Sequence, residues 1–264
     1  MIHLGAHGVV RGIDVETTHF TGNFPESCAL DVCMMPGAPA AYDLARANWQ
    51  EAVSRRPLRG DSHNLFAVDD VQGARASHVR LRIFPDGGVA RLRVHGDVLP
   101  DWETLRRRGD VDLAAVLHGG HIVACSDMFF GSRDNLIMPG DARNMADGWE
   151  TKRRRTPGHD WTIVCLGAPG TIKRVEVDTR HFKGNAPGAC SLDACALPAG
   201  QGDVVWDSAI AIDWRELLPR TPLEADRRHT FDTAPTSVAG ATHVRFNIFP
   251  DGGVARLRLF GRPA

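Results

Sequence analysis

Short runs of alternating apolar and polar residues recur along the chain and predict β-strands. Val9 to Val15 and Thr171 to Val177 are rich in β-branched residues, which favour strands. His78 to Phe84 and Val89 to Val94 flank a Pro-Asp-Gly-Gly turn, and arginines alternate with apolar residues in both runs. That alternation is typical of antiparallel strands with one solvated face. We therefore expect a mainly β protein built as an antiparallel sandwich.

Few segments have a pattern that favours a helix. We expect one helix in each half of the chain, at Ala41 to Ser54 and at Ser208 to Leu218. A third, short helix is expected around Asp101 to Arg107. So low a helical content again favours an all-β architecture.

A long internal repeat organises the sequence. Ile83 to Arg93 and Ile248 to Arg258 carry the same eleven residues, IFPDGGVARLR. Upstream, Gly8 to Asn23 aligns with Gly170 to Asn185, mostly with conservative differences. The period is far too long for a solenoid, so the repeat indicates a duplicated domain.

The two copies differ in length. We expect the first at residues 1–100 and the second at residues 111–264, with residues 101–110 as a linker. Residues 111–162 of the second copy precede the point that aligns with Met1 and have no counterpart in the first copy. The first domain is therefore expected to be incomplete at its N-terminal side.

Composition narrows the classes of function. The hydrophobic fraction of 43% and charged fraction of 24% are ordinary for a globular domain, and the formal net charge is −1. Such a charge does not favour nucleic acid or an anionic membrane as a partner. No apolar stretch approaches the roughly 20 residues that span a bilayer, and the start lacks the pattern of a secretory signal. We expect a cytoplasmic protein.

The six cysteines include two pairs with the same spacing. Cys28 with Cys33 and Cys190 with Cys195 are each separated by four residues. Because side chains alternate along a strand, this spacing puts each pair on opposite faces and disfavours a local disulfide. Small buried thiols are the expected role, and a four-thiolate metal site joining both copies is the alternative. No tight metal-ligand spacing occurs, so the cofactor is left open.

The repeated His-Phe-x-Gly-Asn segment is the first candidate for a site. It holds His19 and Asn23 in the first copy, and His181 and Asn185 in the second. Each segment follows a predicted strand, so we place it on a loop at one end of the sandwich, where function is common. Histidine can act as acid or base near neutral pH, and asparagine can orient an amide. The alternative is a structural turn.

A mixed-charge cluster in the second copy is the second candidate. Its candidate residues are Asp147, Glu150, Arg153, Arg154, Arg155 and His159. An arginine fork binds a small carboxylate in a bidentate manner, and the carboxylates and imidazole can transfer protons. The alternative is a solvated charged face.

Two further repeated features are expected to be structural. Asp86 and its twin Asp251 lie in the Pro-Asp-Gly-Gly turns, whose geometry accounts for them. His78 and its twin His243 each begin or lie in a strand, and we expect hydrogen-bonded structural histidines there.

These motifs, taken together, resemble the allantoicase family over nearly the whole chain. The resemblance rests on ATHVRFNIFPDGGVARLRLFG (241–261), DGWETKRRRTPGHDW (147–161) and the paired VDT-x-HF-x-GN blocks. It implies two jelly-roll β-sandwich domains of the galactose-binding type. It also implies hydrolysis of allantoate to ureidoglycolate and urea in purine degradation, by a homo-oligomer. One departure is that the family carries a DGWE-type block in both domains, whereas this chain has it in the second copy alone.

A hydrolase of this kind needs a cation for the substrate carboxylate, a proton for the leaving ureido nitrogen and a base for the attacking water. For the cation we consider Arg153, Arg154 or Arg155. Glu150 or His159 would supply the proton, and His181 or Asp147 would be the base. Asn185 would orient a ureido group, and His19 and Asn23 are further candidates for binding. The rival readings are a non-catalytic tandem binding module, which the single tyrosine disfavours, or an inactive allantoicase-like fragment.

Overall fold

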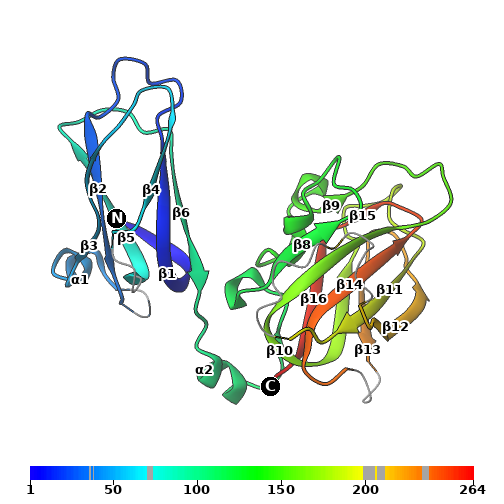
Figure 1. Cartoon of the computed structure of the whole chain (residues 1–264). Helices are drawn as coiled ribbons and strands as arrows, with labels where there is room; N and C mark the ends of the chain where they lie inside the picture. Colours follow the sequence, from blue (N-terminus) through cyan, green and yellow to red (C-terminus); the bar gives the residue numbers. More distant parts are fainter. Residues whose placement is uncertain (36, 38, 70–73, 199–205, 207–211, 234–237) are drawn as a thin grey trace. The chain divides into compact units, whose positions relative to one another are not determined.

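The chain folds into two units that are both built mainly of β-strands. The structure is a computed structural model that describes all residues except 36, 38, 70–73, 199–205, 207–211 and 234–237. Unit 1 comprises Met1–Pro100 and unit 2 comprises Asp101–Ala264 (Figure 1). The prediction of a mainly β protein with a duplicated unit is confirmed. Among the described residues, no helix has the length and apolar character needed to cross a membrane.

Unit 1 is one antiparallel set of strands with a single short helix. In sheet order, β3, β2, β5, β1 and β4 are neighbours, and β6 also pairs with β1. The bounds are β1 (Ile2–Glu16), β2 (Ser27–Cys33), α1 (Ala41–Ala45), β3 (Gln50–Pro57), β4 (His63–Ala67), β5 (Ala74–Phe84) and β6 (Arg91–Val98).

Unit 2 repeats this arrangement and adds elements at its start. Its main sheet has the order β12, β11, β14, β10, β16 and β7, with β13 and β8 also paired to β10, and β15 pairs with β9. The helices are α2 (Trp102–Arg107), η1 (Val116–His118), η2 (Arg133–Ile137) and η3 (Met145–Asp147). The strands are β7 (Val111–Asp112), β8 (His121–Cys125), β9 (Trp149–Glu150), β10 (Asp160–Asp178), β11 (Ala189–Cys195), β12 (Arg215–Pro222), β13 (Arg228–Asp232), β14 (Ala241–Phe249), β15 (Gly253–Val254) and β16 (Arg256–Pro263).

The long strand β10 belongs to both layers of the sandwich in unit 2. Its first part, Asp160 to Cys165, pairs with β14. Its last part, Arg174 to Asp178, pairs with β13 on one side and β16 on the other. The register shifts between Cys165 and Gly170, where the strand leaves one set of partners for the other. In unit 1, β1 changes partners from β5 to β4 in the same way. The loop with His19 and Asn23 follows the end of β1, and the loop with His181 and Asn185 follows the end of β10.

The predicted helices at Ala41 to Ser54 and Ser208 to Leu218 are largely wrong. The first ends at Ala45, and the residues from Gln50 onward form β3. Val53 of β3 is fully buried and lies opposite Leu30 of β2, so pairing and burial outweigh the local helical pattern. Of the second prediction, residues 208–211 lie outside the described residues, and residues 215–218 are in strand β12.

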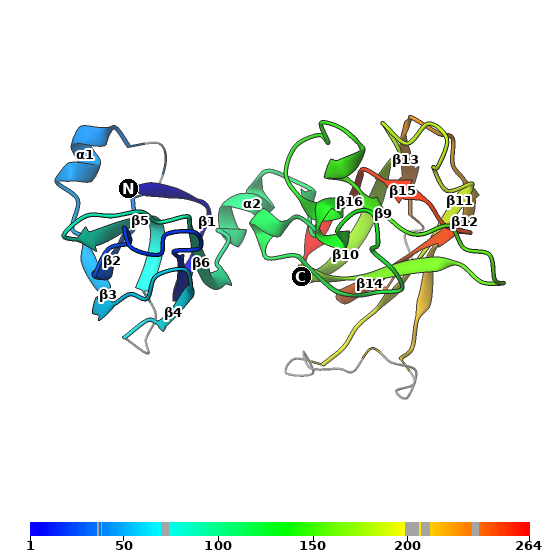
Figure 2. The same cartoon turned by 90° about the horizontal axis from the view of Figure 1, so that it is seen from above.

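The segment that we expected to be a linker contains α2, which is packed onto unit 2. Asp101 caps this helix by accepting a hydrogen bond from the Thr104 backbone N–H at 3.0 Å. Trp102 and Leu105 pack against the core of unit 2. Arg106 donates a hydrogen bond to the carbonyl of the C-terminal residue, and Figures 1 and 2 both show α2 beside that end of the chain.

The two units differ in how completely their repeated strands are covered. Leu257 and Leu259 of β16 are fully buried, whereas their twins Leu92 and Val94 in β6 are partly exposed. In unit 2, η2 and the fully buried Trp149 contribute to the same core as β16. In the described part of unit 1, whose core is smaller, no segment occupies the place of η2 and β9.

The paired cysteines lie in β2 and β11 as free, buried thiols. Cys28 and Cys33, and likewise Cys190 and Cys195, are free and at most a few per cent exposed. Burial raises the pKa of Cys28 to about 11 and that of Cys190 to about 12. These thiols remain protonated at neutral pH, in agreement with their predicted role as small hydrophobic residues.

Candidate active site

Three segments of unit 2, together with Phe130 from the loop after β8, meet around a hollow of about 330 Å³, which we call the Glu150 hollow. One segment is β9 with the residues after it, the second is the loop that follows β10, and the third is the turn between β14 and β15. The lining residues are Phe130, Glu150, Thr151, Arg153, Gly184, Asn185, Ala186, Pro250, Asp251 and Gly252. The sequence thus folds both candidate clusters onto one surface, because each contributes residues to this lining.

A hydrogen bond joins the two predicted clusters inside the hollow. The Asn185 side-chain amide donates to Glu150 Oε1 at 2.5 Å. The residue before Glu150, Trp149, is fully buried, and its indole N–H donates to the Asp127 carbonyl at 2.8 Å. Successive side chains of a strand point to opposite faces, so burial of Trp149 directs Glu150 toward the hollow.

The repeated Pro-Asp-Gly-Gly turn forms one wall of the Glu150 hollow. The Gly253 backbone N–H donates to the Asn185 carbonyl at 2.8 Å. Thr151 and Gly252 exchange two hydrogen bonds of 3.1 Å, one from each backbone N–H. Gly252 has a φ of 137°, a conformation that favours glycine. Backbone hydrogen bonds therefore connect all three segments of the hollow.

A second carboxylate, Asp251, belongs to the same lining. Its Oδ2 accepts a hydrogen bond from the Arg154 backbone N–H at 2.8 Å. The sequence predicted only a turn for this aspartate, and its place in the lining is a finding of the structure. One feature of the sequence pointed to Asp251. Its turn directly follows a predicted strand, as the His-Phe-x-Gly-Asn loop does, and loops at the end of a sandwich often carry function. Phe130 and Thr151 also line the hollow, and neither was a candidate because neither belongs to a recognisable catalytic motif.

The three consecutive arginines of the charged cluster have different environments. Arg154 forms an ion pair with Asp160, whose side chain is 2% exposed. Arg153 lines the Glu150 hollow and is exposed, and Arg155 is exposed but does not line it. Neither Arg153 nor Arg155 has an ion pair within the described parts of the chain. Arg153 is thus the cation of this run that is available to a ligand in the Glu150 hollow.

The structure does not bring Asp147, His159 and His181 into the Glu150 hollow. Asp147 accepts hydrogen bonds from the Arg143 backbone and side chain, at 3.0 and 3.2 Å. His159 packs against Phe249 with the ring centroids 4.6 Å apart. The fixed positions of these groups leave Glu150 and Asp251 as the acidic groups of the lining.

The His-Phe-x-Gly-Asn segments form equivalent turns in both units. His19 and His181 have φ values of 72° and 75°, so the left-handed residue is the histidine. Each histidine backbone N–H donates to an aspartate, Asp61 or Asp226, at 2.8 Å. The His181 ring forms a hydrogen bond of 3.0 Å with the Ala142 carbonyl, in the segment that only unit 2 contains. These contacts give the histidines structural partners, whereas Asn185 alone of this loop's predicted pair faces Glu150.

His19 and Asn23 lie in unit 1, whose turn is built in the same way. The Gly88 backbone N–H donates to the Asn23 carbonyl at 2.7 Å, as Gly253 does to Asn185. No described residue of unit 1 is the twin of Glu150 or Arg153, because their segment precedes the aligned part of the repeat. Unit 1 therefore has two of the three segments that form the hollow in unit 2.

A second hollow, of about 300 Å³, adjoins the charged run, and we call it the cationic hollow. Its lining residues are Ser126, Asp127, Lys152, Arg153, Arg154, Arg155, Thr156 and Asp160. Arg153 lines both the cationic hollow and the Glu150 hollow.

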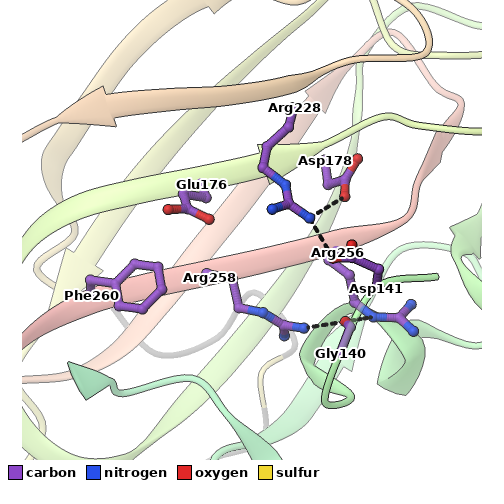
Figure 3. Close-up of a pocket in the computed structure, with 8 residues that line it drawn as sticks. All are labelled: Gly140, Asp141, Glu176, Asp178, Arg228, Arg256, Arg258 and Phe260. Carbon is purple, nitrogen blue, oxygen red and sulfur yellow. Dashed lines mark hydrogen bonds and ion pairs between the residues drawn. The ribbon is translucent and has the colours of Figure 1, made fainter.

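A third hollow, of about 150 Å³, lies on the face of β10 and β16, and its arginines are bonded to other groups of the protein (Figure 3). Arg228 bonds Asp141 and Asp178. Arg256 is 5% exposed and donates to the Gly140 carbonyl at 3.1 Å, and Arg258 donates to the same carbonyl at 2.9 Å. Burial, followed by the neighbouring Arg258, lowers the pKa of Arg256. Arg228 attaches the added segment to β13, and Arg256 and Arg258 attach it to β16, which is a structural role.

No metal site is evident in the described residues. Among them, no group of three or more histidine, cysteine, aspartate or glutamate side chains could hold a metal ion. The identity of any cofactor is left open by the sequence and by this donor set.

Known proteins resemble the chain over nearly its full length. The model of the allantoicase repeat matches residues 1–99 and 111–264. A probable allantoicase of Photobacterium profundum is 49% identical over 262 residues, covering 99% of this chain and 77% of that protein. A probable allantoicase of Pseudomonas aeruginosa is 48% identical over 263 residues, covering 100% of this chain and 77% of the relative.

Solved structures agree with this relationship. The crystal structure of allantoicase from Saccharomyces cerevisiae has a TM-score of 0.78 at 32% identity, covering 97% of this chain and 74% of that one. A second allantoicase structure has a TM-score of 0.81 at 31% identity, covering 98% and 75%. The internal repeat, the shared fold and the identity across the whole chain together show that the chain belongs to the allantoicase family.

Proposed function

We propose that the protein hydrolyses allantoate to ureidoglycolate and urea, and that the Glu150 hollow of unit 2 is its active site. Membership of the allantoicase family supports the reaction. The hydrogen bond between Asn185 and Glu150, in a hollow that also holds Arg153, is the observation that supports the location.

Arg153 is assigned to the substrate carboxylate. It is the arginine of the run that lines the Glu150 hollow, and a guanidinium binds a carboxylate through two parallel hydrogen bonds. Arg154 is committed to the buried Asp160 and would leave that carboxylate unpaired if it moved. This choice selects one of the three arginines that the sequence left as alternatives.

Glu150 and Asp251 are assigned to proton transfer. Allantoate carries two ureido groups on the carbon next to its carboxylate, so a carboxylate held by Arg153 places a ureido nitrogen beside the hollow's acids. Glu150 gives a proton to the leaving ureido nitrogen, and Asp251 takes a proton from the attacking water. Asn185 fixes Glu150 through its amide nitrogen, and its Oδ1 can accept a hydrogen bond from a ureido N–H.

Urea release from allantoate by the purified chain tests the reaction. Glu150→Gln keeps the size of the side chain and its acceptor for Asn185, yet it removes the transferable proton. We expect kcat to fall at least about 100-fold, the usual lower range for losing a general acid or base. Arg153→Gln should instead raise KM about tenfold or more, since a charged hydrogen bond contributes about 1.5–3 kcal/mol.

Arg143→Gln is the matched control, because Arg143 is 85% exposed and lies outside the lining. Its activity should stay within about twofold of the wild type. If Glu150→Gln retains more than a tenth of the wild-type kcat, the assignment of Glu150 fails. Binding of allantoate without urea release would instead favour the non-catalytic alternative.

Cytoplasmic location and homo-oligomer formation remain predictions. The first is supported by composition and the second by the family resemblance. Light scattering on the purified chain, with its size compared to 28.8 kDa per chain, tests the oligomer.

A further inference from the structure

The cationic hollow has a local excess of positive charge that no described residue neutralises. Lys152 is paired with Asp127, with Nζ and Oδ2 3.4 Å apart, and Arg154 is paired with Asp160 at 2.5 Å. The two remaining cations of the lining are Arg153 and Arg155. Both are exposed and without an ion pair in the described chain, so the hollow has an excess of two positive charges.

The lining also contains the hydroxyl groups of Ser126 and Thr156. Thr156 contributes a hydroxyl group next to Arg155. Ser126 Oγ donates to Asp160 Oδ1 at 3.0 Å and accepts from the Trp161 backbone N–H at 2.9 Å, which fixes the wall behind the arginines.

We propose that the cationic hollow is a binding site for a small oxyanion of charge −2, such as sulfate or phosphate. Two unpaired guanidinium groups match that charge, and guanidinium is the preferred partner of such oxyanions. A volume of about 300 Å³ accommodates a small oxyanion. The overall net charge of −1 also argues against a polyanion such as nucleic acid.

The position of Arg153 links this site to the proposed active site. The same guanidinium lines the cationic hollow and the Glu150 hollow. One guanidinium cannot make its bidentate contact with an anion in each hollow at once. A bound dianion therefore competes with the substrate carboxylate for Arg153, so it raises KM and leaves kcat unchanged. This link depends on the proposed function, whereas binding of the anion does not.

Calorimetric titration of the full chain with sulfate tests binding alone, and phosphate provides a second probe of the same class. Wild type and Arg143→Gln should bind sulfate with dissociation constants within twofold of each other. Arg155→Gln should raise the constant at least fivefold. Equal binding by Arg155→Gln and Arg143→Gln overturns the site, as does an equal heat from chloride at matched ionic strength, which would indicate screening.

Steady-state kinetics tests the link between the hollows. Sulfate should increase KM for allantoate in the wild type, and chloride at the same ionic strength should do so far less. Two ratios of Arg155→Gln to wild type are compared, one for the sulfate inhibition constant and one for KM measured without sulfate. The ratio for the inhibition constant should be at least five times the ratio for KM. If the two rise by the same factor, one anion site exists instead of two and the proposal is wrong. A chain with no turnover would refute the proposed function, yet the titration would still decide anion binding.

Discussion

The Asn185 side-chain amide donates a hydrogen bond to Glu150 Oε1 at 2.5 Å, and so joins the loop after β10 to strand β9. Glu150 belongs to the segment that only unit 2 contains, whereas Asn185 belongs to the duplicated part of the chain. Asn23 is the twin of Asn185 in unit 1 and is exposed there. The contact therefore joins a residue of the repeated part of the chain to a residue that has no twin in unit 1.

Replacing this asparagine should affect the two units unequally. Asn185→Ala leaves the Glu150 carboxylate without its fixed donor, so we expect kcat for urea release to fall about 10- to 100-fold, as misplacement of an acid–base group does. Asn23→Ala should change kcat less than twofold. The melting temperature of each variant reports whether the fold is intact. A comparable loss of activity in both variants would place part of the active site in unit 1.

The repeat and the β-rich architecture could be predicted because both depend on local patterns. The identical blocks at Ile83 to Arg93 and Ile248 to Arg258 show the duplication directly, and their alternation of apolar and polar residues predicts strands. The residues from Gln50 onward were predicted as helix and form β3, because long-range pairing with β2 decides their conformation. Local propensity does not contain that contact.

The site was only partly predictable, for a related reason. Glu150, Arg153 and Asn185 were chosen by chemistry, and the fold brings them together. His159 was an equally good chemical candidate, yet its ring packs on Phe249, a placement that depends on tertiary structure. The side chains that a strand or turn directs into a hollow are determined by packing partners far away in the sequence. The turn and the asparagine loop lie side by side in both units, where Gly88 and Gly253 donate to the Asn23 and Asn185 carbonyls. Both segments are repeated in the sequence, but the sequence does not show that they meet.

The glycines of the repeated turn support the loop through close packing. A methyl group added at Gly253 would lie 2.0 Å from the ring of Phe182, a fully buried residue of the loop that carries Asn185. Gly253→Ala should therefore destabilise unit 2 by about 1–3 kcal/mol, the usual cost of overpacking. Activity should fall with it. Gly184→Ala is the control, because nothing lies within 4 Å of the added methyl group. Urea denaturation of the two variants provides the comparison, and equal midpoints would contradict the packing argument.

The unequal covering of the twin cores predicts unequal costs for the same substitution. Leu257 is fully buried in unit 2, whereas its twin Leu92 is partly exposed in unit 1. Leu257→Ala should lower the free energy of unfolding by about 2–5 kcal/mol, because it removes burial and leaves a cavity. Leu92→Ala should cost about half as much or less, since water already reaches that side chain. Denaturant titration, with amide hydrogen exchange to assign each transition to its unit, tests the difference. Equal costs would show that the face of unit 1 is covered in solution.

His243 should make unit 2 sensitive to acid. Its ring is 7% exposed, lies 4.8 Å from the ring of Trp206 and hydrogen-bonds Thr242 Oγ1 at 2.8 Å. Burial, with a smaller contribution from His121, lowers the pKa of His243 to about 4. The unfolded chain, with an ordinary histidine pKa of about 6.5, binds this proton before the folded chain does. Stability from this group is therefore complete above about pH 6.5 and is lost as the pH falls toward 4.

As the pH falls, His243 lowers the free energy of unfolding by about 3 kcal/mol in total. This follows from a pKa difference of about 2.5 at about 1.36 kcal/mol per unit. His243→Gln should be less stable than wild type at pH 7, and the difference should shrink toward pH 4 because the variant has no proton to take up. His95→Gln, at an exposed position of unit 1, should show no such convergence. Urea denaturation at pH 7 and at pH 4.5 measures the effect. A constant difference between wild type and His243→Gln across this range would mean that His243 is protonated in the folded state as readily as in the unfolded chain.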